Sequence, residues 1–266
     1  MTESTELVVF SIEGNVMTIT LNRPDQMNAL NLPTLRQLET AIVRANVEDE
    51  VRCIVLTGAG RAFCAGADVK EWGSGESAVA EATPVEDWVT VAHRIVARLY
   101  RMPKPVIAAV NGVAVGAGLD IALACDFRIA SDRARFGSVY IRLGIPPDAG
   151  ASFFLPRIVG ITKAKELIYT GRIIEAEEAV AIGLVGRVVT AETLASEVAA
   201  FAAELASGPT IAIGMAKENI QEHWTLSIES ALRSEKRAER LSSTTADHAE
   251  GLLAVNEKRQ PLFRAK

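Results

Sequence analysis

Residues 105–126 read PVIAAVNGVAVGAGLDIALACD, and this stretch decides the fold. It begins with Pro105–Val110, an apolar run that is typical of a buried strand. A glycine-rich turn follows, and the pattern then predicts a helix over Gly118–Ala124 and another strand over Asp126–Ala130. A strand that passes through a turn into a helix and returns as a strand is the repeating unit of an α/β protein.

The same alternation extends toward the N-terminus. Val8–Ile12 and Val16–Leu21 are rich in β-branched residues and flank a Glu-Gly-Asn turn at 13–15, which predicts a hairpin. Pro33–Asn46 has apolar residues at helical spacing, and Val51–Thr57 is a continuous apolar strand. Such strands are buried on both faces, so the sequence predicts an α/β fold with helices covering a sheet.

Strand patterns stop in the last quarter of the chain. Ala191–Ala206 predicts an alanine-rich helix, and the Ser-Gly-Pro sequence at 207–209 then breaks the chain. We therefore expect an α/β domain over residues 1–207 and a helical region over residues 208–266. The further elements that the pattern predicts are a helix over Val85–Tyr100, a loop over 72–84, and helices over Pro209–Trp224, Ser227–Leu241 and Asp247–Lys258.

Composition and charge exclude several classes of protein. The 266 residues are 49% hydrophobic and 23% charged, which argues against disorder, and no apolar run approaches the ~20 residues of a membrane-spanning helix. The net charge of −5 argues against nucleic acid as a partner, because phosphate neutralisation requires a basic face. We therefore expect a soluble globular protein without a membrane or nucleic-acid partner.

The cysteines and histidines have no spacing that predicts a disulfide framework or a metal site. There are three of each, scattered along the chain, so we expect no metal. The first residues resemble neither a signal peptide nor a transit peptide, and we expect a cytoplasmic location. Cys64 and Cys125 lie among small residues with no base beside them, which favours inert packing over a nucleophilic role.

Two glycine-rich turns present backbone amides where helices are expected to begin. In the first, the small residues 65–67 allow close approach of a ligand, and Asp68 with Glu71 resembles a capping box. In the second, Ala117 precedes the helix that contains Asp120. Amides at a helix N-terminus are unpaired and lie at the positive end of the helix dipole, so the amide of Ala117 is a natural donor to an anion.

Four motifs in order resemble the enoyl-CoA hydratase/isomerase (crotonase) superfamily. They are AGADVKEW from residue 65, KPVIAAVNGVAVGAGLDIALACD from 104, RFGSVYIRLGIPPDAGASFFLPRIVG from 135 and TGRIIEAEEAVAIGLV from 170. The resemblance runs from Asn22-Arg23-Pro24 to the C-terminal EKRQP. It implies a spiral of ββα turns followed by a C-terminal helical region that forms trimers or pairs of trimers.

The resemblance also implies a substrate and an oxyanion site. The substrate is an acyl-CoA thioester, with coenzyme A as part of the substrate and no prosthetic group. Two amides stabilise negative charge on the thioester oxygen, and the matching positions are Ala67 and Ala117, where alanine replaces the usual glycine at 117. The residues that match the CoA-binding segment are Met27, Ala29, Ala65, Gly66, Ala67, Asp68 and Val69.

The acid/base positions distinguish the reactions of this superfamily. Its hydratases use two glutamates, and this chain has Asp120 and Tyr140 at those positions, which argues against ordinary hydration because tyrosine is a poor base. Asp148 matches the catalytic aspartate of dienoyl-CoA isomerases and of a ring-opening isomerase of phenylacetate metabolism. The resemblance therefore favours double-bond isomerisation with Asp148 as the base, alone or with Asp120.

Three alternatives stay open. The first is a 2-enoyl-CoA hydratase, and the second is a dehalogenase-like enzyme in which Asp148 is the nucleophile and His93 assists it. The third is a CoA-binding protein without turnover. We expect the acyl pocket near the loop 72–84 and the side chains Trp88, Tyr140 and Phe153, and the candidates for binding the CoA phosphates are Arg23, Lys70 and the run Lys258–Lys266.

Overall fold

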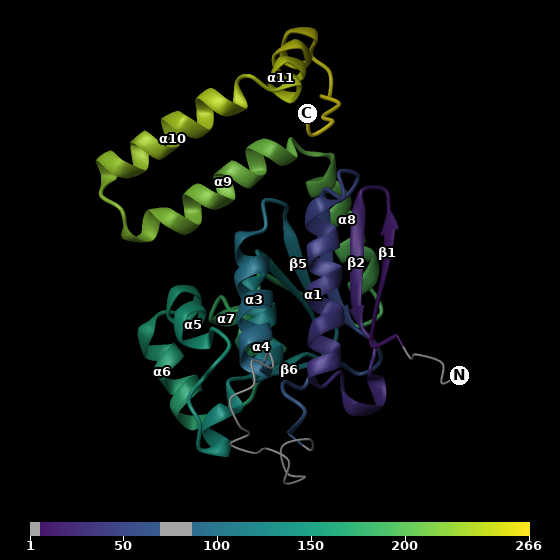
Figure 1. Cartoon of the computed structure of the whole chain (residues 1–266), viewed down its shortest axis with the longest axis vertical. Helices are drawn as coiled ribbons and strands as arrows, with labels where there is room; N and C mark the ends of the chain where they lie inside the picture. Colours follow the sequence, from purple (N-terminus) through teal and green to yellow (C-terminus); the bar gives the residue numbers. More distant parts are fainter. Residues whose placement is uncertain (1–5, 70–86) are drawn as a thin grey trace.

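The computed structural model of the chain describes residues 6–69 and 87–266, and within them lie two β-sheets. The larger sheet has six strands and the smaller one has four (Figure 1). The larger, in spatial order, contains β1 (Val8–Glu13), β2 (Val16–Leu21), β3 (Cys53–Gly58), β5 (Val106–Val110), β7 (Phe127–Ser131) and β10 (Arg187–Val189). The smaller contains β4 (Ala62–Cys64), β6 (Val113–Val115), β8 (Arg135–Gly137) and β9 (Ile174–Glu175).

The chain alternates between the two sheets. β3, β5 and β7 of the larger sheet are each followed by a strand of the smaller sheet. Within each sheet these strands run parallel to one another, β3–β5–β7 in the larger and β4–β6–β8 in the smaller. β6 then leads directly into a helix, α4 (Ala117–Ala124). These repeated ββα turns confirm the α/β fold that the sequence predicts. The strands of the smaller sheet were not predicted, because two or three residues are too few for a period to be recognised.

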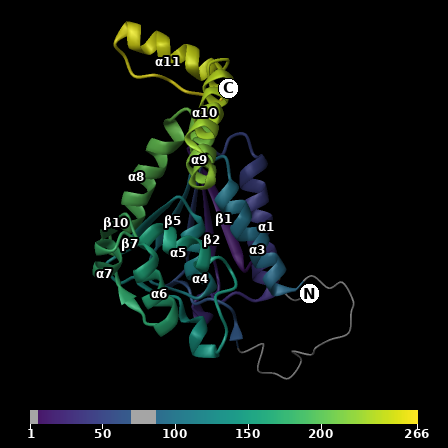
Figure 2. The ribbon, with the colours of Figure 1, turned by 90° about the vertical axis from the view of Figure 1, so that its left-hand side faces the viewer.

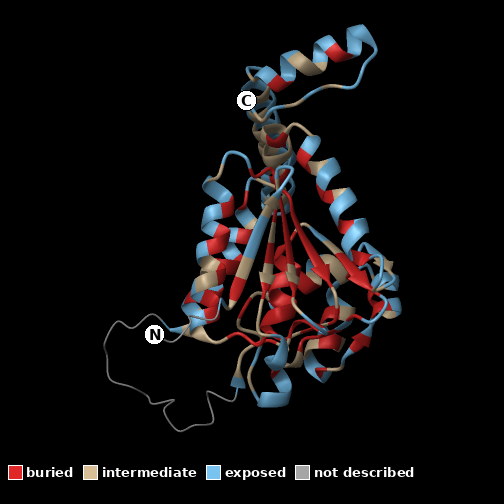
Figure 3. Ribbon diagram, turned by 90° about the vertical axis from the view of Figure 1, so that its right-hand side faces the viewer, coloured by how far each residue is buried: buried red, intermediate tan, exposed pale blue. Residues whose placement is uncertain are grey.

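The larger sheet is covered by helices on both faces (Figure 2). α1 (Leu32–Val47) and α3 (Trp88–Arg101) cover one face, and α8 (Leu194–Ser207) covers the other. Successive residues of a strand point to opposite faces, so Ile54 and Leu56 of β3 join the first cluster while Cys53 and Val55 pack beneath α8. Figure 3 shows the inner strands of the larger sheet buried, while the edge strand β1 and the outer sides of the helices are largely exposed.

Local sequence explains where the N-terminal elements begin and end. β1 and β2 form the expected antiparallel hairpin, with positive φ angles at Gly14 and Asn15 as a tight two-residue turn requires. α1 begins after Asn31, whose side chain accepts a hydrogen bond from the amide of Thr34. The predicted hairpin and first helix are therefore confirmed, and their ends lie within one or two residues of the predicted ones.

The remaining helices lie after the second glycine turn. Three helices follow α4 before the last strand, and three extend beyond the sheets toward the C-terminus (Figure 1). Among the described residues, no single helix is both long and apolar enough to cross a bilayer. The helices of this part are α5 (Ala151–Val159), α6 (Ile161–Thr170), α7 (Ala176–Ala181), α9 (Thr210–Glu222), α10 (Ile228–Ser242) and α11 (Ala246–Glu257).

Two buried cations attach the C-terminal helices to the rest of the protein. Lys217 of α9 donates to Asp126 at 2.8 Å and to the Leu99 carbonyl at 3.3 Å. The Arg52 guanidinium, which precedes β3, donates to the Thr210 hydroxyl at 2.9 Å. Because both cations are paired or hydrogen-bonded, they can be buried at moderate cost and hold α9 in a fixed position.

Candidate active site

The two glycine-rich turns lie against each other at one end of the smaller sheet. Gly66 has a φ of +85°, and a Cβ atom added there would lie 2.9 Å from the Val115 carbonyl oxygen and 3.4 Å from the amide nitrogen of Ala117. Neither the backbone angle nor the space suits an L side chain, so glycine is required at position 66. The contact brings together the two segments that the sequence singles out.

Strand pairing produces this contact. β4 and β6 run parallel, with Ala62 opposite Val113 and Cys64 opposite Ala114. Each strand ends at its glycine turn, so the parallel register carries both turns to the same edge. Gly118, just inside α4, packs so closely that an added Cβ would lie 2.3 Å from the Cys64 carbonyl oxygen.

The amides of Ala67 and Ala117 are available as donors. Ala117 is the first residue of α4, so its N–H has no partner within the helix. Ala67 is bridged to Leu30, but the bonds of that bridge use the Gly66 carbonyl and the Asp68 amide. Neither amide has a hydrogen-bond acceptor in the described part of the chain. Two unpaired backbone donors in adjoining turns form the arrangement that stabilises an oxyanion.

A cavity of about 320 Å³ opens beside these amides. Its described wall is mostly apolar, and it includes both turns together with part of the 3-10 helix η2 (Val139–Leu143). Trp88 is fixed in the wall by a 2.8 Å hydrogen bond from its indole N–H to the Leu30 carbonyl. The described lining residues are Ala65, Gly66, Ala67, Val69, Trp88, Val115, Gly116, Ala117, Val139, Tyr140, Arg142, Leu143, Ile145, Asp148 and Ile173.

Asp148 is the sole carboxylate in the described wall of this cavity. It lies between η2 and α5 and is partly buried, and its Oδ1 atom is buried without a hydrogen-bond partner among the described residues. Burial raises the pKa of the Asp148 carboxyl above its ordinary value, and the Tyr140 hydroxyl opposes this effect. A carboxylate with an unpaired oxygen and a raised pKa is suited to accept a proton from a ligand.

Asp120 lies behind the cavity wall. It is completely buried in the first turn of α4, and the Tyr140 hydroxyl donates to its Oδ2 atom at 2.6 Å. Burial raises the pKa of Asp120 to about 7, the hydrogen bond from Tyr140 acts against this, and the charge of Asp148 adds to it. Burial also raises the pKa of Tyr140, so this hydroxyl stays protonated. Asp120 is therefore absent from the described cavity wall and is connected to it by the hydrogen bond from Tyr140.

The predicted CoA segment is assembled from two parts of the chain. Residues 27–30 run alongside 65–68, with the Ala65 amide donating to the Met27 carbonyl at 3.0 Å and the Leu30 amide donating to the Gly66 carbonyl at 2.8 Å. Ala29 lies in the same segment and is buried. Asn28, which the sequence interpretation missed, donates from its side chain to the Ala59 and Ala62 carbonyls. Its position between Met27 and Ala29 is the sequence signal for that supporting role.

Arg23 and Asp68 form an ion pair at 2.9 Å in which both side chains are nearly buried. Arg23 also donates to the Ala29 carbonyl, so its guanidinium fixes the loop and is not free for a CoA phosphate, contrary to the sequence interpretation. Asp68 accordingly pairs with Arg23, while Glu71 of the suggested capping box lies outside the described residues. Lys70 and the loop 72–84 lie outside them as well.

Two further sequence interpretations are changed by the structure. Phe153 does not line this cavity, because α5 turns it toward Tyr100 and Phe154 in edge-to-face contacts at 5.7 Å and 5.1 Å. His93 is near Asp148, but its Nε2 lies 2.6 Å from the Asp148 backbone carbonyl oxygen. The carbonyl can only accept, so His93 donates there and holds the backbone of Asp148.

Arg142 is a cavity residue that the sequence interpretation missed. It follows Tyr140 by two positions on η2, and it is the only cation in the described wall. In the sequence, the position of Arg142 two residues after Tyr140, in the third motif, was the signal that could have identified it. Cys64 and Cys125 are buried, and burial raises the pKa of each thiol to about 12, so neither is a nucleophile.

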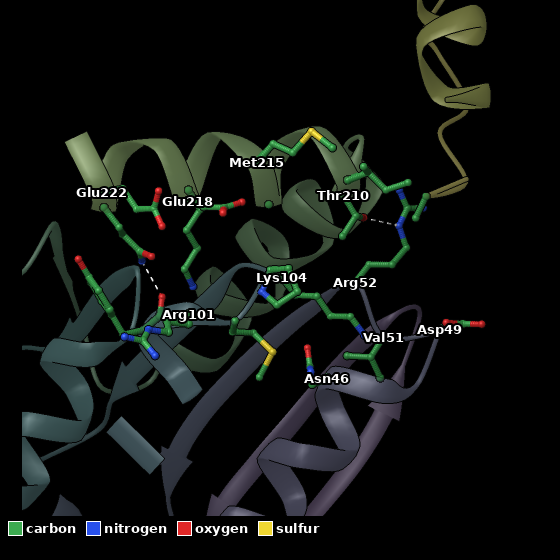
Figure 4. Close-up of a pocket in the computed structure, with 18 residues that line it drawn as sticks. Asn46, Asp49, Val51, Arg52, Arg101, Lys104, Thr210, Met215, Glu218 and Glu222 are labelled. Atoms are coloured by element: carbon green, nitrogen blue, oxygen red, sulfur yellow. Dashed lines mark hydrogen bonds between the residues drawn. The ribbon is translucent and has the colours of Figure 1, made fainter. Parts of the chain in front are cut away.

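A larger cavity of about 600 Å³ lies between α9 and the loops that flank β3 and β5 (Figure 4). Three of the cations that line it, Arg52, Lys104 and Lys217, are hydrogen-bonded within the chain. Arg52 donates to Thr210, and Lys104 donates to the carbonyls of Ala45 and Glu48 at 2.8 Å and 2.7 Å. No residue of the glycine turns lines this cavity, so it is separate from the oxyanion site.

No group of three or more His, Cys, Asp or Glu side chains within 6–69 and 87–266 could hold a metal ion. The groups that the described cavity offers for chemistry are its backbone amides and the carboxyl group of Asp148. It can bind an oxyanion at one end of an apolar cavity while a carboxylate takes up or returns a proton.

The chain is similar over nearly its whole length to several known proteins. The 1,2-epoxyphenylacetyl-CoA isomerase of Escherichia coli is 38% identical over 98% of this chain and 99% of its own length. The short-chain-enoyl-CoA hydratase of Clostridium acetobutylicum is 38% identical over 95% of each chain. A crystal structure of an enoyl-CoA hydratase from Bacillus anthracis superimposes with a TM-score of 0.91 at 40% identity, covering 98% of this chain and 100% of that one.

The family model described as enoyl-CoA hydratase/isomerase matches residues 11–266. This match covers both glycine turns, Asp148 and the C-terminal helices, and it includes nearly the whole chain. The chain therefore belongs to the enoyl-CoA hydratase/isomerase family, whose enzymes act on acyl-CoA thioesters.

Proposed function

We propose that the protein is an enoyl-CoA isomerase that moves a double bond with Asp148 as its base. The observation that carries this proposal is that Asp148 is the one carboxylate in the described cavity wall, whereas hydration in this family uses two glutamates. A 1,3 proton transfer needs one base that serves two carbon atoms. A single carboxylate beside a pair of oxyanion donors is sufficient for that reaction.

The reaction begins with the thioester oxygen between the amides of Ala67 and Ala117. Asp148 removes a proton from the α carbon of a 3-enoyl thioester, and the electron pair moves onto the thioester oxygen to give a dienolate. The two amides stabilise that charge, each contributing about 3 kcal/mol to the transition state. The protonated Asp148 then returns the same proton to the γ carbon, which leaves a 2-enoyl thioester and the original carboxylate.

Coenzyme A is part of the substrate in this proposal, and the reaction uses no prosthetic group. We assign its binding to the paired segments 27–30 and 65–68, which carry the predicted residues Met27 and Ala29 and the predicted run 65–69. Backbone hydrogen bonds between these segments support the assignment, because they form a rigid rim directly beside the amide of Ala67. The apolar part of the cavity would then receive the acyl chain.

The test compares the wild type with Asp148→Asn on 2-enoyl-, 3-enoyl- and 3,5-dienoyl-CoA in separate assays. Loss of the base should reduce isomerisation by about 10³-fold, because positioned acid/base groups contribute about 10²- to 10⁴-fold. The matched control is Asp49→Asn, an exposed turn residue far from the cavity, which should retain wild-type rates. Efficient hydration of 2-enoyl-CoA by the wild type, with no loss in Asp148→Asn, would contradict the proposal.

Hydration of 2-enoyl-CoA is the second candidate, because a relative of similar identity is named a hydratase. The same assays distinguish the candidates by the substrate that is consumed. Tight acyl-CoA binding without turnover on any substrate would instead favour a non-catalytic role. A dehalogenase-like reaction requires Asp148 to attack an aromatic acyl group, so release of halide from a halogenated benzoyl-CoA would indicate it.

We further propose that residues 208–266 mediate assembly into a homotrimer or a pair of trimers in the cytoplasm. Large apolar side chains on α9 and α10 and between them support this proposal, since they are more than half exposed in the single chain. Light scattering at micromolar concentration should give a trimeric or hexameric mass, and a monomeric mass would contradict it. The exposed side chains are Ile220, Trp224, Ile228 and Leu232.

A further inference from the structure

The Tyr140 hydroxyl interacts with two carboxyl groups, those of Asp120 and Asp148. It donates to Asp120 Oδ2 at 2.6 Å, and the carboxyl group of Asp148 interacts with the same hydroxyl. A phenol has one proton and therefore donates to one carboxylate at a time. Whether Asp148 receives this hydrogen bond thus depends on the protonation state of Asp120.

Asp120 is in an environment that favours its neutral form. It is completely buried, its Oδ1 atom has no hydrogen-bond partner in the described part of the chain, and the carboxylate of Asp148 is close enough to repel a second negative charge. A carboxylate with few hydrogen-bond donors is more costly to bury than a neutral carboxylic acid. When Asp120 is protonated, it donates to Tyr140, and the hydroxyl is released to donate to Asp148.

The groups packed around α4 add few other charges. From α3, His93 donates to the Asp148 carbonyl and its charge acts on the Asp148 carboxyl. From β4, the buried Cys64 thiol stays neutral, and β6 carries no titratable residue. From α5, Arg157 is turned away and lies 3.7 Å from the Phe153 ring. The pKa of Asp120 is therefore governed first by its burial, then by the Tyr140 hydroxyl and the charge of Asp148, with smaller effects of the Ala151 and Ala149 amides.

We propose that Asp120 is a positioning residue that, through the Tyr140 hydroxyl, controls whether Asp148 receives a hydrogen bond. This inference rests on the proposed isomerase reaction. In the first state Asp120 is neutral, Tyr140 donates to Asp148, and Asp148 is a stabilised, weaker base. In the second state Asp120 is ionised, Tyr140 donates to Asp120, and Asp148 is a stronger base because it has lost the hydrogen bond from Tyr140.

The proton of Asp120 has one route out of its buried position. Asp120 transfers its proton to the Tyr140 oxygen while Tyr140 transfers its own proton to Asp148, so that the hydroxyl is regenerated. Asp148 then loses the proton to water in the open cavity. One proton leaves, Asp120 becomes a carboxylate, and Tyr140 and Asp148 return to their earlier states.

The first measurement needs no turnover. Infrared spectra of the protein with isotope-labelled aspartate should contain the C=O band of a protonated carboxylic acid, which disappears as the pH passes about 7. The band should be absent in Asp120→Asn and present in the control Asp49→Asn. Loss of the band in Asp148→Asn but not in Asp120→Asn would overturn the inference, as would the absence of any such band.

The second measurement is the pH profile of kcat for isomerisation. The wild type should show a second rise of about threefold to tenfold near the titration of Asp120, which is the effect of removing one hydrogen bond from the base. Asp120→Asn should lose this rise, because the Asn amide donates permanently to Tyr140. Tyr140→Phe should lose it as well, and it preserves the ring if Asp120→Asn fails to fold.

The two proposals fail in different ways. If Asp148→Asn retains full activity, the proposed isomerase mechanism is wrong whatever the infrared band does. If Asp148→Asn is inactive but Tyr140→Phe keeps the second rise, the mechanism stands and the control by Asp120 is wrong. A lower kcat with an unchanged pH profile in both variants would indicate a merely structural role for Asp120 and would also overturn the inference.

Discussion

The His93 imidazole holds the backbone of Asp148, with Nε2 2.6 Å from the carbonyl oxygen, although 55 residues separate the two in sequence. His93 is on α3 and Asp148 is in the segment between η2 and α5. The hydrogen bond therefore joins the helix that covers the larger sheet to the segment that carries the proposed base. In this arrangement His93 positions Asp148 but takes no part in the reaction itself, and this predicts how large the effect of removing His93 should be.

His93→Ala should lower kcat by about fivefold and leave KM nearly unchanged, because a single hydrogen bond contributes about 1 kcal/mol. The measurement is steady-state isomerisation, with His248→Ala, an exposed change on α11, as the control. His93→Gln, which retains an N–H donor, should recover part of the loss. A decrease of 10³-fold or more would instead place His93 in the chemistry, as the dehalogenase-like alternative requires.

Gly66→Ala should lower kcat by about 10²-fold, because the new Cβ would displace the Val115 carbonyl and with it the oxyanion amides. Gly14→Ala is the matched control, since Gly14 also has a positive φ but nothing lies within 4 Å of its added Cβ. Both variants should lose about 1–2 kcal/mol of unfolding free energy from backbone strain. Equal losses of kcat in both would contradict the oxyanion assignment.

Asp120 should make the stability of the protein pH-dependent. Burial raises the pKa of Asp120 from its ordinary value of 3.8 to about 7, so its folded form binds a proton more tightly than its unfolded form. The resulting stabilisation is complete below the unfolded value and is lost as the pH rises through the folded value. The total is on the order of 4 kcal/mol, because each pKa unit corresponds to about 1.4 kcal/mol.

Asp120→Asn removes this titration. The difference in unfolding free energy between Asp120→Asn and the wild type, measured by urea denaturation, should therefore shift in favour of the variant between about pH 4 and pH 7. Asp49→Asn should follow the wild type at every pH. A difference that stays constant with pH would mean that Asp120 does not change protonation in this range.

The buried pair of Lys217 and Asp126 should contribute strongly to stability. Both side chains are largely buried, at 8% and 18% exposure, so Lys217→Met would leave a carboxylate without its cation. The expected loss is about 3–5 kcal/mol of unfolding free energy, compared with little change in the exposed control Lys165→Met.

The double variant Lys217→Met with Asp126→Asn should recover most of that loss. Asn keeps an oxygen that accepts from the Val106 amide, as Asp126 does at 2.8 Å, and it carries no charge. Urea denaturation of the wild type and the three variants measures the coupling. Additive losses from the two single variants would show that the pair does not stabilise the attachment of α9.

The sequence by itself determined the α/β class, the positions of the long elements and the two glycine-rich turns. These features are local, since apolar periodicity, a capping side chain or a glycine before a helix acts within a few residues. The glycines at 66, 116 and 118 can also be recognised in the sequence, but the physical reasons for two of them come from the other turn. At Gly66 and Gly118 the neighbouring backbone excludes a Cβ, and at Gly116 the backbone has a positive φ.

Only the tertiary structure decided how the carboxyl groups are arranged. Sequence placed Asp120, Tyr140 and Asp148 at catalytic positions, but the folded chain buries Asp120 behind Tyr140 and leaves Asp148 in the cavity wall. In the folded chain Phe153 also packs against Tyr100 and not against the cavity, and Arg23 forms an ion pair with Asp68. The physical reason is that burial, and with it the pKa of a carboxyl group, depends on neighbours from distant parts of the chain, which no local pattern contains.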